Sequence, residues 1–112
     1  MAVTAAHRVL AIGALSALLG AGCTAIEGAR LYRDGTEALE RGDAEQAVVA
    51  LEGAAERVPE ASEVQNHLGL AYLALGRRGE AQLAFERAVA LDCGNAAAVH
   101  NLELLRADSL AH

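Results

Sequence analysis

Two cysteines carry the most reactive side chains of this 112-residue chain. Cys23 ends the apolar stretch LLGAGC, and Cys93 lies in the C-terminal stretch LDCGN. Their spacing matches no CxxC, zinc or haem pattern. Three roles are therefore open to Cys23: it could carry a lipid, form a disulfide with Cys93, or be an ordinary small residue late in a membrane-spanning helix.

The other polar residues form no arrangement that is typical of an enzyme. His67 and His100 fall on neighbouring predicted helices, but no nearby Asp or Cys completes a metal-binding set. The sequence contains no phosphate-binding loop, paired carboxylate site or Ser/His/Asp arrangement. We therefore expect no catalytic activity, no metal and no cofactor.

The charge of the chain disfavours nucleic acid as a partner. The formal net charge is −6, and all nine basic residues are arginines. The longest basic run is Arg77-Arg78, so no basic stripe offsets the repulsion from phosphates. A protein partner that recognises an acidic or mixed surface fits this composition.

The N-terminal 22 residues have the composition of a secretory signal peptide. A weakly basic start, MAVTAAHR, precedes the uncharged stretch VLAIGALSALLGAG, which ends in small residues. A single-span anchor is the main rival, because the uncharged stretch from Val9 to Ile26 approaches the roughly 20 residues that cross a membrane. A signal peptide cut at another site is a further alternative, whereas a buried helix of the folded domain is disfavoured by the lack of a polar face.

The stretch LLGAGC resembles the lipobox of bacterial lipoproteins, in which a leucine and two small residues precede the cysteine. The resemblance implies that residues 1–22 are removed and that Cys23, as the first mature residue, carries diacylglycerol on its sulfur. Ala21 and Gly22 fit the motif, but Gly20 stands where the family usually has leucine. Thr24 replaces the aspartate that favours inner-membrane retention in enteric bacteria. The implied location is the bacterial envelope, facing the periplasm, with the outer membrane favoured.

The elements that position these residues follow a repeat of 34 residues, which begins at Gly28. A fixed period of this kind is the mark of a repeat array. Shifting the sequence by one period aligns Gly35 with Gly69, Leu39 with Leu73, Gly42 with Gly76, Ala47 with Ala81, Ala50 with Ala84, Glu52 with Glu86 and Ala54 with Ala88. The next period aligns Leu68 with Leu102 and Leu70 with Leu104.

Each unit is predicted to form two helices. Abundant Ala, Leu, Arg and Glu and few β-branched residues favour helix over sheet. Apolar residues also recur at helical spacing on one face of the stretch 81–91 and on the helix before it. The expected helices span residues 28–41, 44–57, 62–75, 78–91 and 96–107.

Turn and cap residues mark the ends of these helices. Gly42 and Gly76 stand where a left-handed helix terminator is expected. Three residues are expected to cap the helices that they precede, and the first two have a glutamine three residues later in the manner of a capping box: Asp43, Ser62 and Asn95.

The unit SEVQNHLGLAYLALGRRGEAQLAFERAVALDCGN, residues 62–95, resembles the tetratricopeptide repeat closely. Its signature positions are held by Leu68, Gly69, Tyr72, Gly76, Ala81, Phe85 and Ala88. Cys93 stands where the family has proline, and Gln65 replaces the usual early aromatic residue. The unit at residues 28–61 is more divergent, because Asp34 takes the place of a buried leucine and Ala38 that of a tyrosine.

The resemblance implies an all-α fold: a right-handed antiparallel helix-hairpin solenoid. Its expected parts are a short tether at residues 23–27, repeats at 28–61 and 62–95, a closing helix at 96–108 and a tail at 109–112. Because Asp34 is expected to weaken the first unit, we predict that this unit is stabilised by a partner, by a second copy of the chain in a homodimer, or by the membrane surface.

The resemblance also implies a concave groove lined by the first helix of each unit. Four leucines among these positions would make an apolar strip if they are exposed together; the alternative is that the last helix covers most of them or that they are scattered. The family's lysine clamp for a partner's carboxylate is not expected, since the chain has no lysine. The groove positions are Tyr32, Thr36, Leu39, Glu63, Asn66, Leu70, Leu73, His100 and Leu104.

The expected function is therefore that of a membrane-tethered module that binds a protein or peptide partner in its groove. It could assist the assembly of an envelope complex such as a pilus or a secretion system. One alternative is an accessory or regulatory subunit that docks on an envelope enzyme. Another is a repeat scaffold held by a single membrane span.

Overall fold

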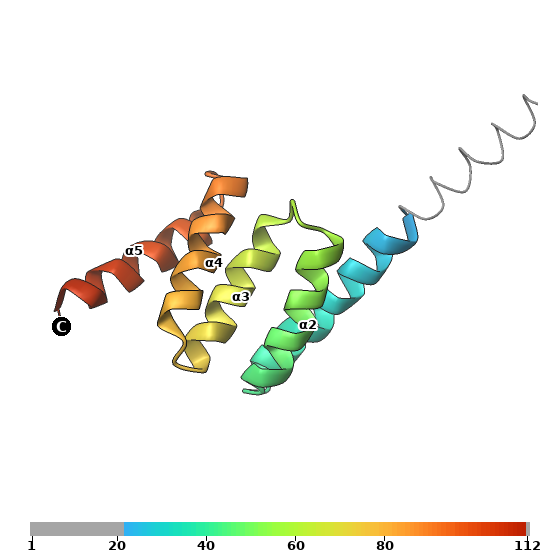
Figure 1. Cartoon of the computed structure of the whole chain (residues 1–112), viewed down its shortest axis with the longest axis horizontal. Helices are drawn as coiled ribbons and strands as arrows, with labels where there is room; N and C mark the ends of the chain where they lie inside the picture. The colour runs from blue at the N-terminus through green and yellow to red at the C-terminus, as the bar shows by residue number, and fades with distance from the viewer. Residues whose placement is uncertain (1–21, 112) are drawn as a thin grey trace, which may run out of the picture.

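The computed structural model of the chain describes residues 22–111. Residues 1–21 of the expected signal peptide and His112 of the expected tail lie outside this range. The described residues form five helices and no strand, which confirms the predicted all-α helix-hairpin solenoid (Figure 1). The helices are the N-terminal helix at residues 22–40, α2 (Ala44–Arg57), α3 (Ser62–Ala74), α4 (Arg78–Leu91) and α5 (Ala96–Ala111).

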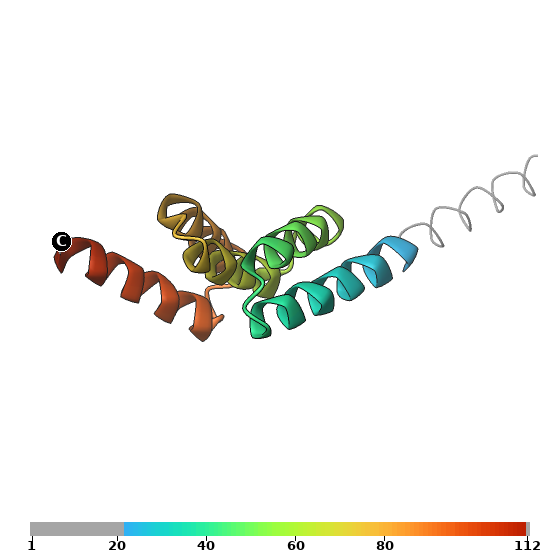
Figure 2. The same ribbon diagram turned by 90° about the horizontal axis from the view of Figure 1, so that it is seen from below.

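The helices follow one another along the stack in chain order (Figure 1). The N-terminal helix pairs with α2, and α3 pairs with α4, so that each unit is a helix hairpin. Helix α3 also packs against α2 and α5, which joins the two units into one body. Figure 2 shows the N-terminal helix and α5 on the same side of the stack, diverging towards its two ends.

Two helices are longer than expected. Residues 23–27 are helical and continue the N-terminal helix instead of forming an extended tether. No proline interrupts them, and the Glu27 carboxylate lies 3.1 Å from the Arg57 guanidinium of α2. At the other end, α5 runs to Ala111, where the Ser109 hydroxyl donates to the Leu105 carbonyl at 2.9 Å.

The turns within the two hairpins have the expected chemistry. Gly42 and Gly76 have φ values of +79° and +74°, a region in which other residues are strained. Asp43 caps α2, because its Oδ1 accepts the backbone N–H of Gln46 at 3.2 Å. Asn95 caps α5 in the same way, with its Oδ1 3.1 Å from the N of Ala98.

The predicted capping box at Ser62 does not form. Ser62 is already the first residue of α3, and its side chain is buried. Its hydroxyl donates to the Ala88 carbonyl at 2.8 Å and accepts from Asn95 Nδ2 at 2.8 Å. The Gln65 Oε1 atom is buried and has no hydrogen-bond partner among the described residues. Ser62 therefore ties α3 to the last turn of α4 and to the residue that caps α5.

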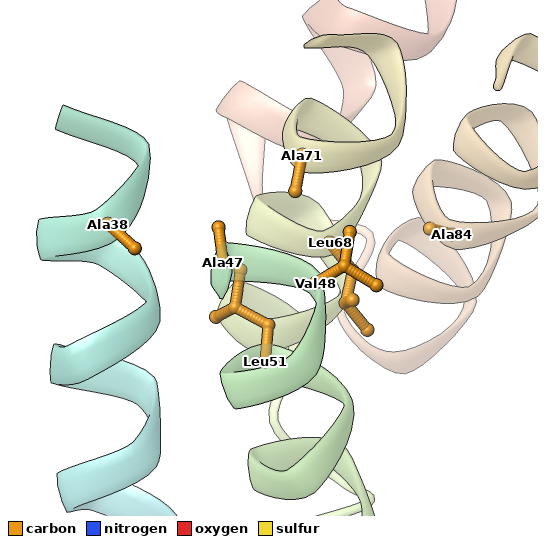
Figure 3. Packing of buried hydrophobic residues seen from close by; sticks show 7 residues of the cluster. All are labelled: Ala38, Ala47, Val48, Leu51, Leu68, Ala71 and Ala84. Atoms are coloured by element: carbon orange, nitrogen blue, oxygen red, sulfur yellow. The ribbon is translucent and has the colours of Figure 1, made fainter. Parts of the chain in front are cut away.

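The core is built from small residues that allow close helix contacts. Figure 3 shows alanines of the N-terminal helix, α3 and α4 around the larger side chains of Val48, Leu51 and Leu68. A second cluster joins α4 to α5 and contains Ala81, Phe85, Leu102 and Leu105.

The same close contact occurs once in each hairpin. A Cβ built on Gly35 would lie 2.5 Å from Cγ of Leu51, and one built on Gly69 would lie 2.5 Å from Cδ1 of Phe85. Leu51 and Phe85 are the largest fully buried side chains of the described region. Each glycine thus leaves room for the large residue of the helix that follows it.

Asp34 does not lie in the core, although the repeat aligns it with a buried leucine; that it weakens the first unit stays a prediction. Leu68 and Leu102, at the same repeat position, are buried in the two core clusters that join successive units. Asp34 instead lies on the outer face of the N-terminal helix with 43% of its side chain exposed, 3.9 Å from Arg30 Nε and 3.8 Å from an Arg33 nitrogen. The difference arises because the N-terminal helix is the outermost described helix at its end of the stack (Figure 1), so this position has no core to fill.

The other end of the described stack is also charged. Glu103 and Arg106 of α5 stand at the repeat positions of Gly69 and Tyr72, and both are exposed. The Arg106 guanidinium lies 3.4 Å from the Glu86 carboxylate of α4. A further helix that packed on this face as Phe85 packs on Gly69 would have to bury both charges, which is costly unless they are paired.

Candidate functional site

A hollow lies between the N-terminal helix, the loop that joins α2 to α3, and the start of α3. Its volume is about 380 Å³, which lies within the usual range of ligand pockets. All of its lining residues except Tyr32 and Glu63 are apolar or glycine. The lining residues are Ala25, Gly28, Ala29, Tyr32, Val58, Ala61, Glu63 and Val64.

The pocket brings together two of the predicted groove residues, Tyr32 and Glu63, from successive units. Tyr32 also contacts His67, with their rings edge to face and 5.2 Å between the centroids. The Tyr32 hydroxyl oxygen lies 3.3 Å from His67 Nδ1, and that nitrogen donates to the Glu63 carbonyl at 2.9 Å. Burial raises the pKa of Tyr32, and the nearby charge of Glu63 raises it further. The aromatic wall of the pocket is therefore held in place by α3.

The side chains of two other predicted groove residues form hydrogen bonds within the fold. Asn66 is buried, and its Oδ1 accepts a hydrogen bond from Asn101 Nδ2 of α5 at 2.9 Å. The Thr36 hydroxyl donates to the Arg33 carbonyl of its own helix at 2.9 Å. Asn66 thus contributes to the contact between α3 and α5 instead of presenting its side chain to a partner.

The four predicted groove leucines differ in exposure. Leu39 packs against the first core cluster, and Leu70 and Leu73 pack against the second, so all three are only partly exposed. Leu104 of α5 is 55% exposed. His100, on the same helix, is exposed as well. The leucines therefore do not form an evenly exposed strip, and Leu104 is the member that is most available to a partner.

Sequence reasoning missed most of the pocket wall. The expected groove positions all lie on the first helices, whereas Val58 and Ala61 lie in the loop between α2 and α3. Ala25 falls in the predicted tether, but the helical structure of residues 22–27 brings it into the pocket. The apolar character of Val58 and Ala61, on either side of the exposed loop residues Pro59 and Glu60, was the available signal.

Both cysteines are exposed, free thiols in the structure. Within residues 22–111, no three His, Cys, Asp or Glu side chains are grouped so that they could hold a metal ion. None of the helices in this range has the length and apolar character needed to cross a membrane.

Comparison with known protein families places the chain in one of them. A family model described as Tetratricopeptide repeat matches residues 38–104, which is more than half of the chain. The match covers the second helix of the first hairpin, the whole second hairpin and most of α5. No curated protein matches the chain.

Proposed function

The chain belongs to the tetratricopeptide repeat family, and we propose on this premise that it is a membrane-tethered protein-interaction module of the bacterial envelope. The family typically serves as a non-catalytic scaffold for protein–protein interaction. The tether is a lipid on Cys23, in the sequence context LLGAGC. The partner is a protein or peptide held on the side of the first helices, as a component of an envelope assembly such as a pilus or a secretion system.

One observation carries the binding part of this proposal: the apolar pocket that Tyr32 and Glu63 line across the two units. Exposed apolar surface of this kind favours the docking of another protein. Leu104 extends the candidate surface to α5, because it is a large apolar side chain that the fold leaves 55% exposed.

Site-specific photo-crosslinking in cells tests the binding surface. A photoreactive amino acid replaces Leu104 in one strain and Leu83 in another. Leu83 is a matched control, because it is 52% exposed but lies on α4, outside the predicted groove. We expect a discrete protein adduct from position 104 and none from position 83. Equal crosslinking at both positions, or none at 104, would exclude this surface as the binding face.

The membrane tether is tested by the intact mass of the protein in the membrane fraction. We expect a chain that begins at Cys23 and carries the added mass of diacylglycerol or of a triacylated cysteine. A Cys23→Ser variant should keep its N-terminal segment and lack the lipid. An unmodified chain with an intact N-terminus in the wild type would support the single-span anchor instead.

A further inference from the structure

We propose that the pocket between the N-terminal helix and α3 binds a protein segment in which an apolar side chain stands next to an arginine or lysine. This inference rests on the proposed function, since it names the chemistry of the partner that the module binds. It specifies that the apolar side chain enters the pocket and that the cation pairs with the Glu63 carboxylate.

The pocket is suited to an apolar side chain by its lining and its size. Alanine and valine side chains form most of its wall, and Tyr32 forms its aromatic part. A volume of about 380 Å³ is near the lower end for ligand pockets, so it suits one or two side chains and not a whole helix. The apolar part of a partner would therefore be buried here, while its backbone passes over the rim.

The charged lining of the pocket is acidic. Glu63 is its charged lining residue, is exposed, and has no ion-pair partner among residues 22–111. Three arginines adjoin lining residues in sequence, and each lies near a carboxylate that is not part of the lining: Arg57 is 3.1 Å from Glu27, while Arg30 and Arg33 are 3.9 Å and 3.8 Å from Asp34. An incoming cation thus finds an uncompensated carboxylate, whereas an incoming carboxylate is repelled.

The shape of the neighbouring surface supports the same assignment. The Tyr32 ring is held edge to face by His67, so the wall beside Glu63 is fixed before a partner arrives. Tyr32 and Glu63 line the same pocket, so the carboxylate lies on the aromatic side of its wall. A pocket that is already formed loses less conformational freedom on binding than one that must be ordered.

The test uses three small probes that differ in charge: phenethylammonium, 2-phenylethanol and phenylacetate. The full-length protein is reconstituted in nanodiscs of zwitterionic lipid and labelled at its alanine and valine methyl groups. Methyl NMR then follows Val58 and Val64 in the pocket, with Val49 of α2, an exposed residue outside the pocket, as the internal control. We expect the cation to bind about fivefold more tightly than the neutral alcohol, and the anion to bind more weakly still.

Two variants identify the groups responsible. Glu63→Gln should remove the difference between the cation and the alcohol while the alcohol still shifts Val58 and Val64. Ala29→Leu fills the pocket from an exposed helix position and should abolish the response to all three probes, with circular dichroism reporting that the helices are retained. Equal affinity of the three probes, shifts confined to residues outside the pocket, or a preference for the cation that survives Glu63→Gln would each overturn the inference.

These outcomes are separable from a failure of the proposed function. Adducts at position 104 without a cation preference in the pocket would leave the interaction module in place and remove only the stated partner chemistry. A cation preference without any adduct at position 104 would support the pocket chemistry and remove the wider binding face.

Discussion

The ring of Phe85 in α4 occupies the space that a side chain on Gly69 of α3 would need. A Cβ at Gly69 would lie 2.5 Å from Cδ1 and 2.7 Å from Cζ of the ring. Phe85 is fully buried and contributes to the cluster that joins α4 to α5. The hairpin contact and the contact between units therefore depend on the same side chain.

Gly69→Ala is expected to lower the free energy of unfolding by about 1–3 kcal/mol, because the Phe85 ring must move out of a packed site. Gly79→Ala is the matched control: no atom lies within 4 Å of its Cβ, and alanine is the better helix former. That variant should be unchanged or more stable by up to ~0.5 kcal/mol. Urea unfolding of residues 24–112 compares them, and equal effects of the two substitutions would contradict the packing argument.

Ser62→Ala removes a buried hydroxyl that joins three helices. The Ala88 carbonyl and the Asn95 amide each lose a partner, so we expect a loss of about 1–3 kcal/mol in the free energy of unfolding. Ser109→Ala serves as control, since Ser109 is exposed: its hydroxyl donates to the Leu105 carbonyl of its own helix and accepts a long bond of 3.4 Å from Arg78 at the surface. The control should change stability by less than ~0.5 kcal/mol. A Ser62→Ala variant as stable as the control would show that the buried bonds contribute nothing net.

Asp34 and Leu68 share a repeat position but not an environment. Leu68→Ala should cost about 2–5 kcal/mol, since it opens a cavity between α2, α3 and α4. Asp34→Ala should change the free energy of unfolding by less than ~0.5 kcal/mol, because the side chain lies at the surface in long ion pairs. Chemical denaturation of both variants at two protein concentrations gives the comparison. A large loss for Asp34→Ala would contradict its placement at the surface, and a clear gain in stability would support the prediction that Asp34 weakens the first unit.

Stability should fall at alkaline pH through Tyr72. Burial, and then the hydrogen bond to Glu52 at 2.6 Å, raise the pKa of Tyr72 from 10.0 to about 12. The folded state holds this proton more tightly than the unfolded state, so the contribution is complete below pH 10 and is lost as the pH rises from about 10 towards 12. Unfolding of wild type and Tyr72→Phe at pH 8 and pH 11 measures it.

The Tyr72→Phe variant should lose less stability between these pH values than the wild type. A smaller decline should persist in it, because the pKa of Tyr32 is also raised. Parallel declines in the two proteins would exclude Tyr72 as the source.

Much of the fold could be predicted because the repeat carries local signals. Gly42 and Gly76 mark turns through backbone conformation alone, and Asp43 caps α2 through a bond within its own turn. Serine is a residue type that favours the N-cap position, yet the Ser62 hydroxyl forms hydrogen bonds with residues that are distant in sequence. Asp34 is not buried for a related reason: a repeat position predicts burial only where a neighbouring unit covers it.

The candidate site was less predictable. Family positions identified Tyr32 and Glu63, which do meet in one pocket. The exposure of the groove leucines depends on how α5 packs on α3 and α4, and the 34-residue period contains no information on that packing. The contribution of Val58 depends on the course of a loop, which the helical pattern does not specify.

The N-terminal helix runs without a break from residue 22 to residue 40, so no hinge separates Cys23 from the pocket. At about 1.5 Å per residue, Tyr32 stands only some 14 Å along the axis from Cys23. If Cys23 is acylated, the helix acts as a short rigid spacer that fixes the height of the pocket above the lipid headgroups. The orientation of the pocket relative to the membrane can then change only if the whole protein tilts or rotates about its anchor. Diffusion towards a partner is then confined to the membrane plane. The pocket meets proteins that expose their binding segment at the same height above the lipid headgroups.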